Sequence, residues 1–311
     1  RGLAVIAKPP FQWSMLHPRF WLVWLAIALA WLTSWLPYSW LMAIGRALGR
    51  LSFKLLKSRR KIAKRNLELC FPEMDEATRN ELLTKNAEET GCAAIETMIA
   101  WWWPDWRFKK YSSFLGYEHL QNAIADGKGV LLLSPHMLHL EASGRIFGLN
   151  HPSVGFYRPH NNPVMEYFMV RGRNRGNKYM IGKRDVKALI HALNNQEVCF
   201  YLPDQDYGRN RSLFVPFFAV PDAATTTGTL LFAKAANCVV VPIYSRRLPN
   251  QQGYQVEILA PFDNFPSGDD QADVIRINQW VEQAVTQHPE QYMWVHRRFK
   301  TRPDPDAPSL Y

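Results

Sequence analysis

The chain has 311 residues, 47% of them hydrophobic and 21% charged, which is enough for one large domain or two small ones with a substantial core. Lysine and arginine number 37 against 27 acidic residues, so the formal net charge is +10. This balance favours an anionic partner, which charge alone does not identify among nucleic acid, acidic lipid, phosphorylated ligands and an acidic carrier protein.

The N-terminal segment is dominated by an uncharged apolar run, FWLVWLAIALAWLTSWL, from Phe20 to Leu36, which Pro37 interrupts. Its length is at the lower limit for a helix that spans a bilayer, and its tryptophans are of the type enriched at membrane interfaces. The run therefore either spans a membrane or lies in its interface, and a buried helix of a soluble core is the alternative. We expect residues 1–45 to form a membrane anchor.

A basic block without acidic residues follows the apolar run. Its members are Arg46, Arg50, Lys54, Lys57, Arg59, Arg60, Lys61, Lys64 and Arg65. Such a block beside an apolar helix is typical of the cytoplasmic face of a membrane, where it attracts anionic lipid. An apolar stripe recurs within it at helical spacing, at Leu48, Leu51, Leu55 and Ile62. The stripe predicts a basic amphipathic helix on a membrane surface.

A solvated basic face or an RNA-binding helix is the alternative for this block. Phe53 is its only aromatic residue, which is too few for a surface that stacks bases. Nucleic acid is therefore not expected as a partner. The four cysteines, Cys70, Cys92, Cys199 and Cys238, form no CxxC pair, so we expect free, buried thiols rather than a zinc site or a disulfide framework.

Residues 46–311 are expected to form a cytoplasmic α/β domain. The stretch from Asp75, a candidate N-cap, to the residues before Pro104 has long helical periodicity. Strand-like runs lie at 129–133, 153–157, 197–202, 237–245 and 254–260, and helical candidates at 139–149, 162–176, 184–194, 224–236 and 270–288. This alternation predicts a mostly parallel sheet flanked by helices, with ligands bound beyond the carboxyl ends of its strands.

The stretch SPHMLHLEASGR, Ser134 to Arg145, directly follows the strand-like run GVLLL. Pro135 disfavours helix before it, so His136 can lie in a turn and Glu141 on the first turn of the next helix. A carboxylate bonded to one ring nitrogen fixes the tautomer and leaves the other nitrogen free as a general base. We predict that His136 deprotonates a substrate hydroxyl and that Glu141 orients its ring.

Other interpretations of these residues are weaker. His136, His139 and Glu141 lack the spacing of the HExxH metal motif, so no metal is expected. Ser134 is not flanked as in the nucleophile elbow of serine hydrolases. A hydrogen-bonded histidine at a strand end, with a surface glutamate nearby, is the structural alternative.

The order of apolar anchor, basic helix, strand and H-x-x-x-x-E resembles the H-x4-D/E acyltransferases, specifically the late acyltransferases of lipid A biosynthesis, which include lauroyl and myristoyl transferases. Blocks that look like family motifs follow in family order: RNLELCFPEM (65–74), PHMLHLEASGRIFG (135–148), YRPHNNP (157–163), RGRNR (171–175), LPDQDYG (202–208), VPFFAVPDAATTTGT (215–229) and EQYMWVHRRFKTRP (290–303). The resemblance covers the chain from about residue 20 to its end.

The resemblance implies a glycerolipid-acyltransferase-like fold and an enzyme of the bacterial inner membrane, with residues 46–311 as its cytoplasmic acyltransferase domain. The implied reaction moves a fatty acyl chain from acyl carrier protein to a hydroxyacyl hydroxyl of a Kdo-bearing lipid A precursor. His136 would be the general base and Glu141 its orienting partner. The hydroxyl would attack the thioester directly in a ternary complex, so no metal, other cofactor or covalent enzyme intermediate is expected.

Arginines are the candidates for binding the polyanionic acceptor, because guanidinium groups suit phosphate and carboxylate. Arg173 is the first candidate for stabilising the oxyanion or holding a phosphate, and backbone N–H groups are the alternative. The other candidates, in two loops expected near one sheet edge, are Arg158, Arg171, Arg175, Arg209 and Arg211. Asp204 or Asp206 is expected to pair with one of these arginines rather than to bind Mg²⁺.

Two alternative functions differ in testable ways. A glycerophosphate-type acyltransferase shares the H-x4-D pattern but normally has an FPEG-like phosphate-binding block, where this chain has LPDQDYG. A membrane-tethered basic binding protein without catalysis would keep its function when His136 is replaced, whereas an acyltransferase would lose it.

Overall fold

The computed structural model describes residues 5–6 and 9–311. Its central sheet has eight strands in the order β1-β5-β4-β6-β3-β9-β10-β2. Their bounds are Val5–Ile6 (β1), Ser112–Leu115 (β2), Gly129–Leu133 (β3), Ser153–Tyr157 (β4), Asn177–Gly182 (β5), Val198–Tyr201 (β6), Cys238–Arg247 (β9) and Tyr254–Ile258 (β10). The strands from β5 to β9 in this order run parallel, as do β10 and β2, while the pairs β1–β5 and β9–β10 are antiparallel. The predicted α/β fold with a mostly parallel sheet is confirmed.

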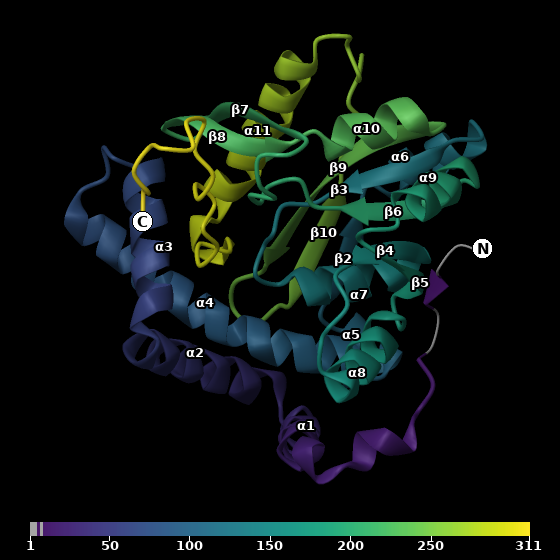
Figure 1. The fold of residues 1–311 in the computed structure, drawn as a ribbon. Helices are drawn as coiled ribbons and strands as arrows, with labels where there is room; N and C mark the ends of the chain where they lie inside the picture. The colour runs from purple at the N-terminus through teal and green to yellow at the C-terminus, as the bar shows by residue number, and fades with distance from the viewer. Residues whose placement is uncertain (1–4, 7–8) are drawn as a thin grey trace.

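The helices cover both faces of this sheet (Figure 1). Their bounds are Trp21–Thr33 (α1), Tyr38–Leu55 (α2), Lys57–Cys70 (α3), Glu76–Trp102 (α4), Asp105–Lys109 (α5), Tyr117–Ala125 (α6), Leu140–Asn150 (α7), Pro163–Arg173 (α8), Val186–Asn194 (α9), Gly228–Ala235 (α10) and Asp270–Gln287 (α11). Short 3-10 helices lie at Trp13–Leu16, Pro18–Phe20 and Pro289–Gln291. Figure 1 shows the long helix α4 with α2 lying alongside it and α1 beyond.

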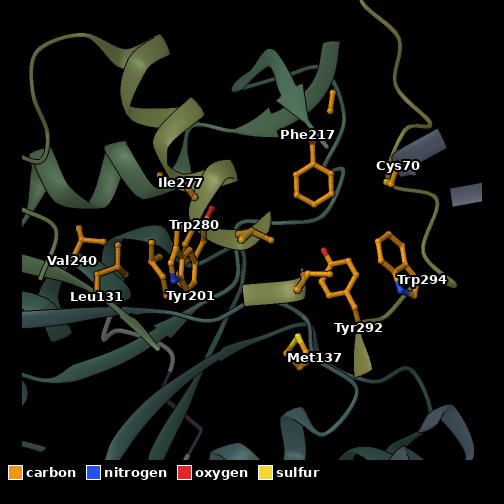
Figure 2. Packing of buried hydrophobic residues seen from close by; sticks show 14 of the residues in the cluster. Cys70, Leu131, Met137, Tyr201, Phe217, Val240, Ile277, Trp280, Tyr292 and Trp294 are labelled. Carbon is orange, nitrogen blue, oxygen red and sulfur yellow. The ribbon is translucent and has the colours of Figure 1, made fainter. Parts of the chain in front are cut away.

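β3 explains why the two faces form separate cores. All five of its residues are buried, as expected for a central parallel strand covered on both sides. Val130 and Leu132 point into a core made with α4, α6, α7 and α8. Leu131 and Leu133 point into the opposite core, with α9, α10 and α11. Figure 2 shows part of this second core, where Leu131 lies near Trp280 of α11.

One predicted helix begins later than expected. Residues 224–226 are not helical: they end strand β8 (Val220–Thr226), which pairs with β7 (Ser212–Phe217) in an antiparallel hairpin. The β-branched Thr225 fits this strand, and its hydroxyl accepts hydrogen bonds from Asn278 and Arg298. α10 therefore begins only at Gly228.

The four cysteines are free as expected, and Cys238 is only half-buried.

The N-terminal apolar run forms a shorter helix than predicted. α1 has 13 residues, about 20 Å of helix, against about 30 Å of bilayer hydrocarbon. It is followed by Ser34, whose carbonyl accepts hydrogen bonds from Trp103 and Arg107. Pro37 is then the N-cap of α2. Across residues 5–6 and 9–311, no helix combines the length and apolar character needed to cross a bilayer. The predicted boundary at residues 45 and 46 falls inside α2.

The basic block does not form the single helix that the sequence predicts. It is divided between α2 and α3, which meet at Leu56. Leu48, Leu51 and Leu55 lie exposed on the outer side of α2, whereas Ile62 of α3 is buried. The predicted stripe of four therefore becomes an exposed stripe of three leucines.

α4 is fixed to the sheet by a buried ion pair. Arg247 of β9 donates from Nε and Nη2 to the Glu96 carboxylate at 2.7 and 2.5 Å, and both side chains are buried. Glu89, two turns earlier on α4, also contacts the Arg247 guanidinium. A buried pair of this kind fixes the register of α4 on the sheet, because neither charge can lose its partner without a large desolvation cost.

α2 packs on α4 through glycines. A Cβ atom on Gly91 would lie 1.9 Å from the Gly45 carbonyl oxygen, and one on Gly49 would lie 2.0 Å from the Ala87 carbonyl oxygen. The two helix backbones are therefore in direct contact, which only residues without a side chain allow.

We predict that Gly91→Ala destabilises the fold by about 2 kcal/mol or more, because the added methyl must push α2 away from α4. Thermal unfolding in detergent micelles measures the effect. Gly182→Ala is the matched control, since a Cβ there meets no atom within 4 Å. Equal unfolding temperatures for the two variants would contradict the packing argument.

Candidate active site

The candidate active site lies where β3 and β6 end. The two strands are parallel neighbours with Leu133 opposite Tyr201. His136 and Asp204 each follow their strand by the same number of residues, so the two turns bring them to the same edge of the sheet. This is the carboxyl edge, where parallel sheets bind ligands.

Asp204 holds His136 through two hydrogen bonds. The Nδ1 atom of His136 lies 2.5 Å from Oδ1 of Asp204, and the His136 backbone N–H donates to Oδ2 at 2.8 Å. The Tyr292 hydroxyl also donates to Oδ2, at 2.7 Å. With Nδ1 donating to the carboxylate, the His136 Nε2 atom is left as the acceptor, the form that a general base requires.

The Asp204 carboxyl is fully buried, and burial alone would raise its pKa. The adjacent His136 ring, the Tyr292 hydroxyl and the His136 N–H together hold that pKa below its ordinary value. Asp204 is therefore a carboxylate at neutral pH and can stabilise a positive charge on His136.

A C-terminal segment completes the turn that carries His136. The Leu138 N–H donates to the Gln291 carbonyl at 2.8 Å, and the Met293 N–H donates to the His136 carbonyl at 3.2 Å. Tyr292, between them in sequence, reaches Asp204. The turn after β3 is thus clamped between the loop after β6 and residues 291–293.

Glu141 lies in a different ion pair from the one expected. Arg173 donates to its Oε1 atom from Nε at 3.0 Å and from Nη2 at 2.6 Å. The indole N–H of Trp101 donates to Oε2 at 3.1 Å. The expected hydrogen bond between Glu141 and His136 is therefore wrong: the ring nitrogen is held by Asp204 instead. The expected pairing of Asp204 or Asp206 with one of the candidate arginines is also wrong: Asp204 is bonded to His136 and Tyr292, and Asp206 to Thr301.

The reason lies in the turn between the two residues. α7 begins at Leu140, after a turn fixed by the C-terminal segment, so Glu141 on the first helical turn faces α8 and α4 rather than the strand end. Burial lowers the pKa of Arg173, but the Glu141 carboxylate more than offsets this and raises it. The pair is thus a stable ionic contact.

A cavity of about 1220 Å³ opens beside both pairs. His136, Glu141 and Arg173 all line it. Its lining includes four cations from loops and the C-terminal segment, Arg158, Arg211, Lys183 and Lys300. The residues that α4 contributes are small or apolar: Ala93, Ala94, Thr97, Ala100 and Trp101. The cavity that His136 lines therefore has both cationic and apolar lining residues.

The candidate arginines divide into two groups. Arg158, Arg173 and Arg211 line the cavity. The other three have structural contacts elsewhere: Arg171 stacks over Tyr167, Arg175 donates to the Trp103 carbonyl, and Arg209 donates to the carbonyls of Arg302 and Pro303.

Some residues at the site were not identified from the sequence. Lys183 directly follows β5, a strand that the sequence patterns did not predict. Lys300 comes from the distant C-terminal segment. Asp206 accepts hydrogen bonds from Thr301 N–H at 2.7 Å and from its hydroxyl at 2.9 Å, which brings that segment to the cavity.

The chain matches the sequence profile of the bacterial lipid A biosynthesis acyltransferases over residues 8–301. It is 45% identical to the lipid A biosynthesis lauroyltransferase of Escherichia coli, over 97% of this chain and 99% of that protein. The chain belongs to the bacterial lipid A biosynthesis acyltransferase family. It is therefore an acyltransferase, and the family resemblance of its sequence blocks is confirmed.

Other members of the family are also similar over most of their length. A lipid A biosynthesis acyltransferase of Haemophilus influenzae is 44% identical over 97% of this chain and 98% of that protein. The lipid A biosynthesis palmitoleoyltransferase of E. coli is 39% identical over the same shares of the two chains. Among solved structures, a 1-acyl-sn-glycerophosphate acyltransferase from Thermotoga maritima covers 79% of this chain and 97% of its own, at 13% identity. Its TM-score of 0.38 is too low to bear on function.

The second histidine of the motif has a structural position in this acyltransferase. His139 is buried, and its Nε2 atom lies 3.0 Å from the Ser245 hydroxyl. Burial lowers the pKa of His139 to about 4. Within the described part of the chain, histidine, cysteine, aspartate and glutamate side chains form no group of three placed to hold a metal ion.

We predict that His139 makes the acyltransferase sensitive to acid. Below pH 6.5 the His139 ring becomes protonated in the unfolded chain but stays neutral in the folded one. The free energy of unfolding therefore falls by up to about 3 kcal/mol as the pH approaches 4. Denaturant unfolding of wild type and His139→Gln at several pH values across this window measures the difference. If the two free energies fall in parallel, His139 does not carry the effect.

Proposed function

We propose that this acyltransferase moves a fatty acyl chain from acyl carrier protein to a hydroxyl of a hydroxyacyl chain on a Kdo-bearing lipid A precursor. The observation that carries the proposal is His136, held on Asp204 through Nδ1, at a cavity lined by both cationic and apolar side chains. A charged headgroup and a hydrocarbon chain can both be accommodated beside one general base. The names of the family relatives support lipid A chemistry.

In the proposed reaction, His136 Nε2 removes the proton of the acceptor hydroxyl as its oxygen attacks the thioester carbonyl carbon. The tetrahedral intermediate then collapses, the carbon–sulfur bond breaks, and the carrier thiolate takes the proton back from His136. Asp204 stabilises the imidazolium that exists between these steps, as a carboxylate does in hydrolase triads. The displacement is direct, so no covalent enzyme intermediate forms, and we propose no metal or other cofactor.

Glu141 has a different part in this proposal from the one that the sequence suggested. It fixes the Arg173 guanidinium at the cavity wall through two N–H groups. Arg173 is then positioned to stabilise the oxyanion or to hold an acceptor phosphate. The exposed cations Arg158, Lys183, Arg211 and Lys300 are proposed to bind the phosphate and carboxylate groups of the acceptor.

We predict that purified protein adds one or more acyl chains to a tetraacylated, Kdo-bearing precursor when given acyl carrier proteins charged with ten- to sixteen-carbon chains. His136→Ala and Asp204→Asn should each lower the rate by about 100-fold or more, since both remove general-base catalysis. Glu141→Gln should also lower the rate, because Arg173 would be held less firmly at the cavity. Mass spectrometry of the lipid measures the product.

His191→Ala is the matched control, because His191 is an exposed histidine on α9. A full rate in His136→Ala would contradict the catalytic assignment. Acylation of glycerol phosphate in place of the lipid A precursor would contradict the substrate assignment.

The membrane location is also a proposal: we place the enzyme at the inner membrane of a Gram-negative bacterium, with the catalytic domain on the cytoplasmic side. α1 has no buried residue, and Leu22 on it is 80% exposed. Leu48, Leu51 and Leu55 are exposed among the basic residues of α2. Apolar side chains flanked by lysine and arginine suit the interface of an anionic bilayer. The same positive charge suits an acidic carrier protein, whose docking should weaken as salt rises.

We expect the double variant Leu22→Asp, Leu29→Asp to lose binding to vesicles that contain anionic lipid, while its unfolding temperature stays at the wild-type value, because both leucines are exposed. Co-sedimentation with vesicles measures binding. Leu115→Asp, an exposed leucine of β2, is the control. Unchanged binding of the double variant would exclude α1 as the membrane contact.

A further inference from the structure

Helix α7 contains two glycines with different surroundings. A Cβ atom on Gly148 would lie 2.1 Å from the Gly176 backbone, so packing requires glycine there. A Cβ atom on Gly144 would meet no atom within 4 Å. Packing therefore gives no reason for the missing side chain at Gly144.

The missing side chain at Gly144 is costly to the helix. Glycine inside a helix is about 1 kcal/mol less favourable than alanine. Three other glycines that line the cavity have a reason in the structure: a Cβ on Gly172 would overlap the Trp101 indole, one on Gly155 would overlap the Met180 side chain, and Gly208 has a positive φ of 94°. Gly144 thus costs helix stability without any packing contact that explains it, and it lines the cavity, where a ligand can use the free space.

The position of Gly144 identifies the chemistry of that ligand. Gly144 lines the cavity one helical turn after Glu141 and on the same face of α7. α4 packs against α7 here: the neighbouring Arg145 donates to the Ala100 carbonyl at 2.7 Å. The facing part of α4 contributes Ala93, Ala94, Thr97 and Ala100 to the lining. Where α4 and α7 meet, the cavity is thus lined by small side chains and a bare backbone, which suits an unbranched hydrocarbon.

We propose that Gly144 is a specificity-determining residue: the bare surface of α7 leaves room for a segment of a substrate acyl chain, and a side chain placed there limits the chains that fit. The inference rests on the proposed function and deepens it. The acyl chain can belong to the thioester donor or to the acceptor lipid, and the two sources are separable by experiment.

The first arm of the test varies the donor. Wild type, Gly144→Ala and Gly144→Leu receive one acceptor and an equimolar mixture of acyl carrier proteins charged with ten-, twelve-, fourteen- and sixteen-carbon chains. In Gly144→Leu the ratio of longer to shorter products should fall about tenfold or more, the usual effect of a few misplaced methylene groups. Gly182→Leu is the control, because its surroundings are as open as those of Gly144.

The second arm holds the donor constant and varies the acceptor, comparing the tetraacylated precursor with one that carries fewer acyl chains. A higher KM for the more acylated acceptor, with an unchanged donor ratio, assigns this part of the cavity to the acceptor. A shifted donor ratio assigns it to the donor. If neither quantity changes in Gly144→Leu, the inference is wrong.

A third readout does not depend on turnover. Gly144→Ala should unfold at the wild-type temperature or above it, because alanine favours helix, while binding of a fluorescent long-chain fatty acid should weaken about tenfold in Gly144→Leu. A lower unfolding temperature in Gly144→Ala, or unchanged binding of the fatty acid, overturns the inference. Wild type that binds the fatty acid but acylates no lipid overturns the proposed function and leaves the inference standing.

Discussion

A single buried carboxylate, Asp204, holds the active site together. It accepts hydrogen bonds from the ring and backbone of His136 and from the Tyr292 hydroxyl, so three segments far apart in sequence converge on two oxygen atoms. A buried charge without partners costs several kcal/mol, which makes these contacts interdependent. Displacing either His136 or Tyr292 would therefore remove hydrogen bonds from a buried charge. The geometry of His136 follows from this constraint.

The two carboxylates of the site have separate partners. Asp204 is bonded to the histidine, and Glu141 to Arg173 and Trp101. A histidine and an arginine, each with its own carboxylate, face the same cavity. In the proposed mechanism, this separation lets His136 exchange a proton while Arg173 keeps its charge, because each has a carboxylate of its own.

Most of the architecture could be predicted from sequence because apolar runs such as GVLLL show a buried strand directly. His136 was found because its turn follows such a strand. Asp204 was assigned to the wrong partner because β3 and β6 are far apart in the sequence, and the spacing of nearby residues does not show that they pair. With the order of the strands known, the equal offsets of His136 and Asp204 from Leu133 and Tyr201 would have been enough. The β7–β8 hairpin was missed because its threonines and alanines fit either structure.

The contact between residues 291–293 and the turn of His136 also sets an order of events during synthesis. The exposed apolar helix α1 leaves the ribosome long before Tyr292 does, so at the membrane location proposed above the chain would meet a lipid surface before His136 is held in place. Only when the last part of the chain has been made can the histidine acquire its fixed orientation. Under that proposal, contact with lipid would come before the ability to act on it.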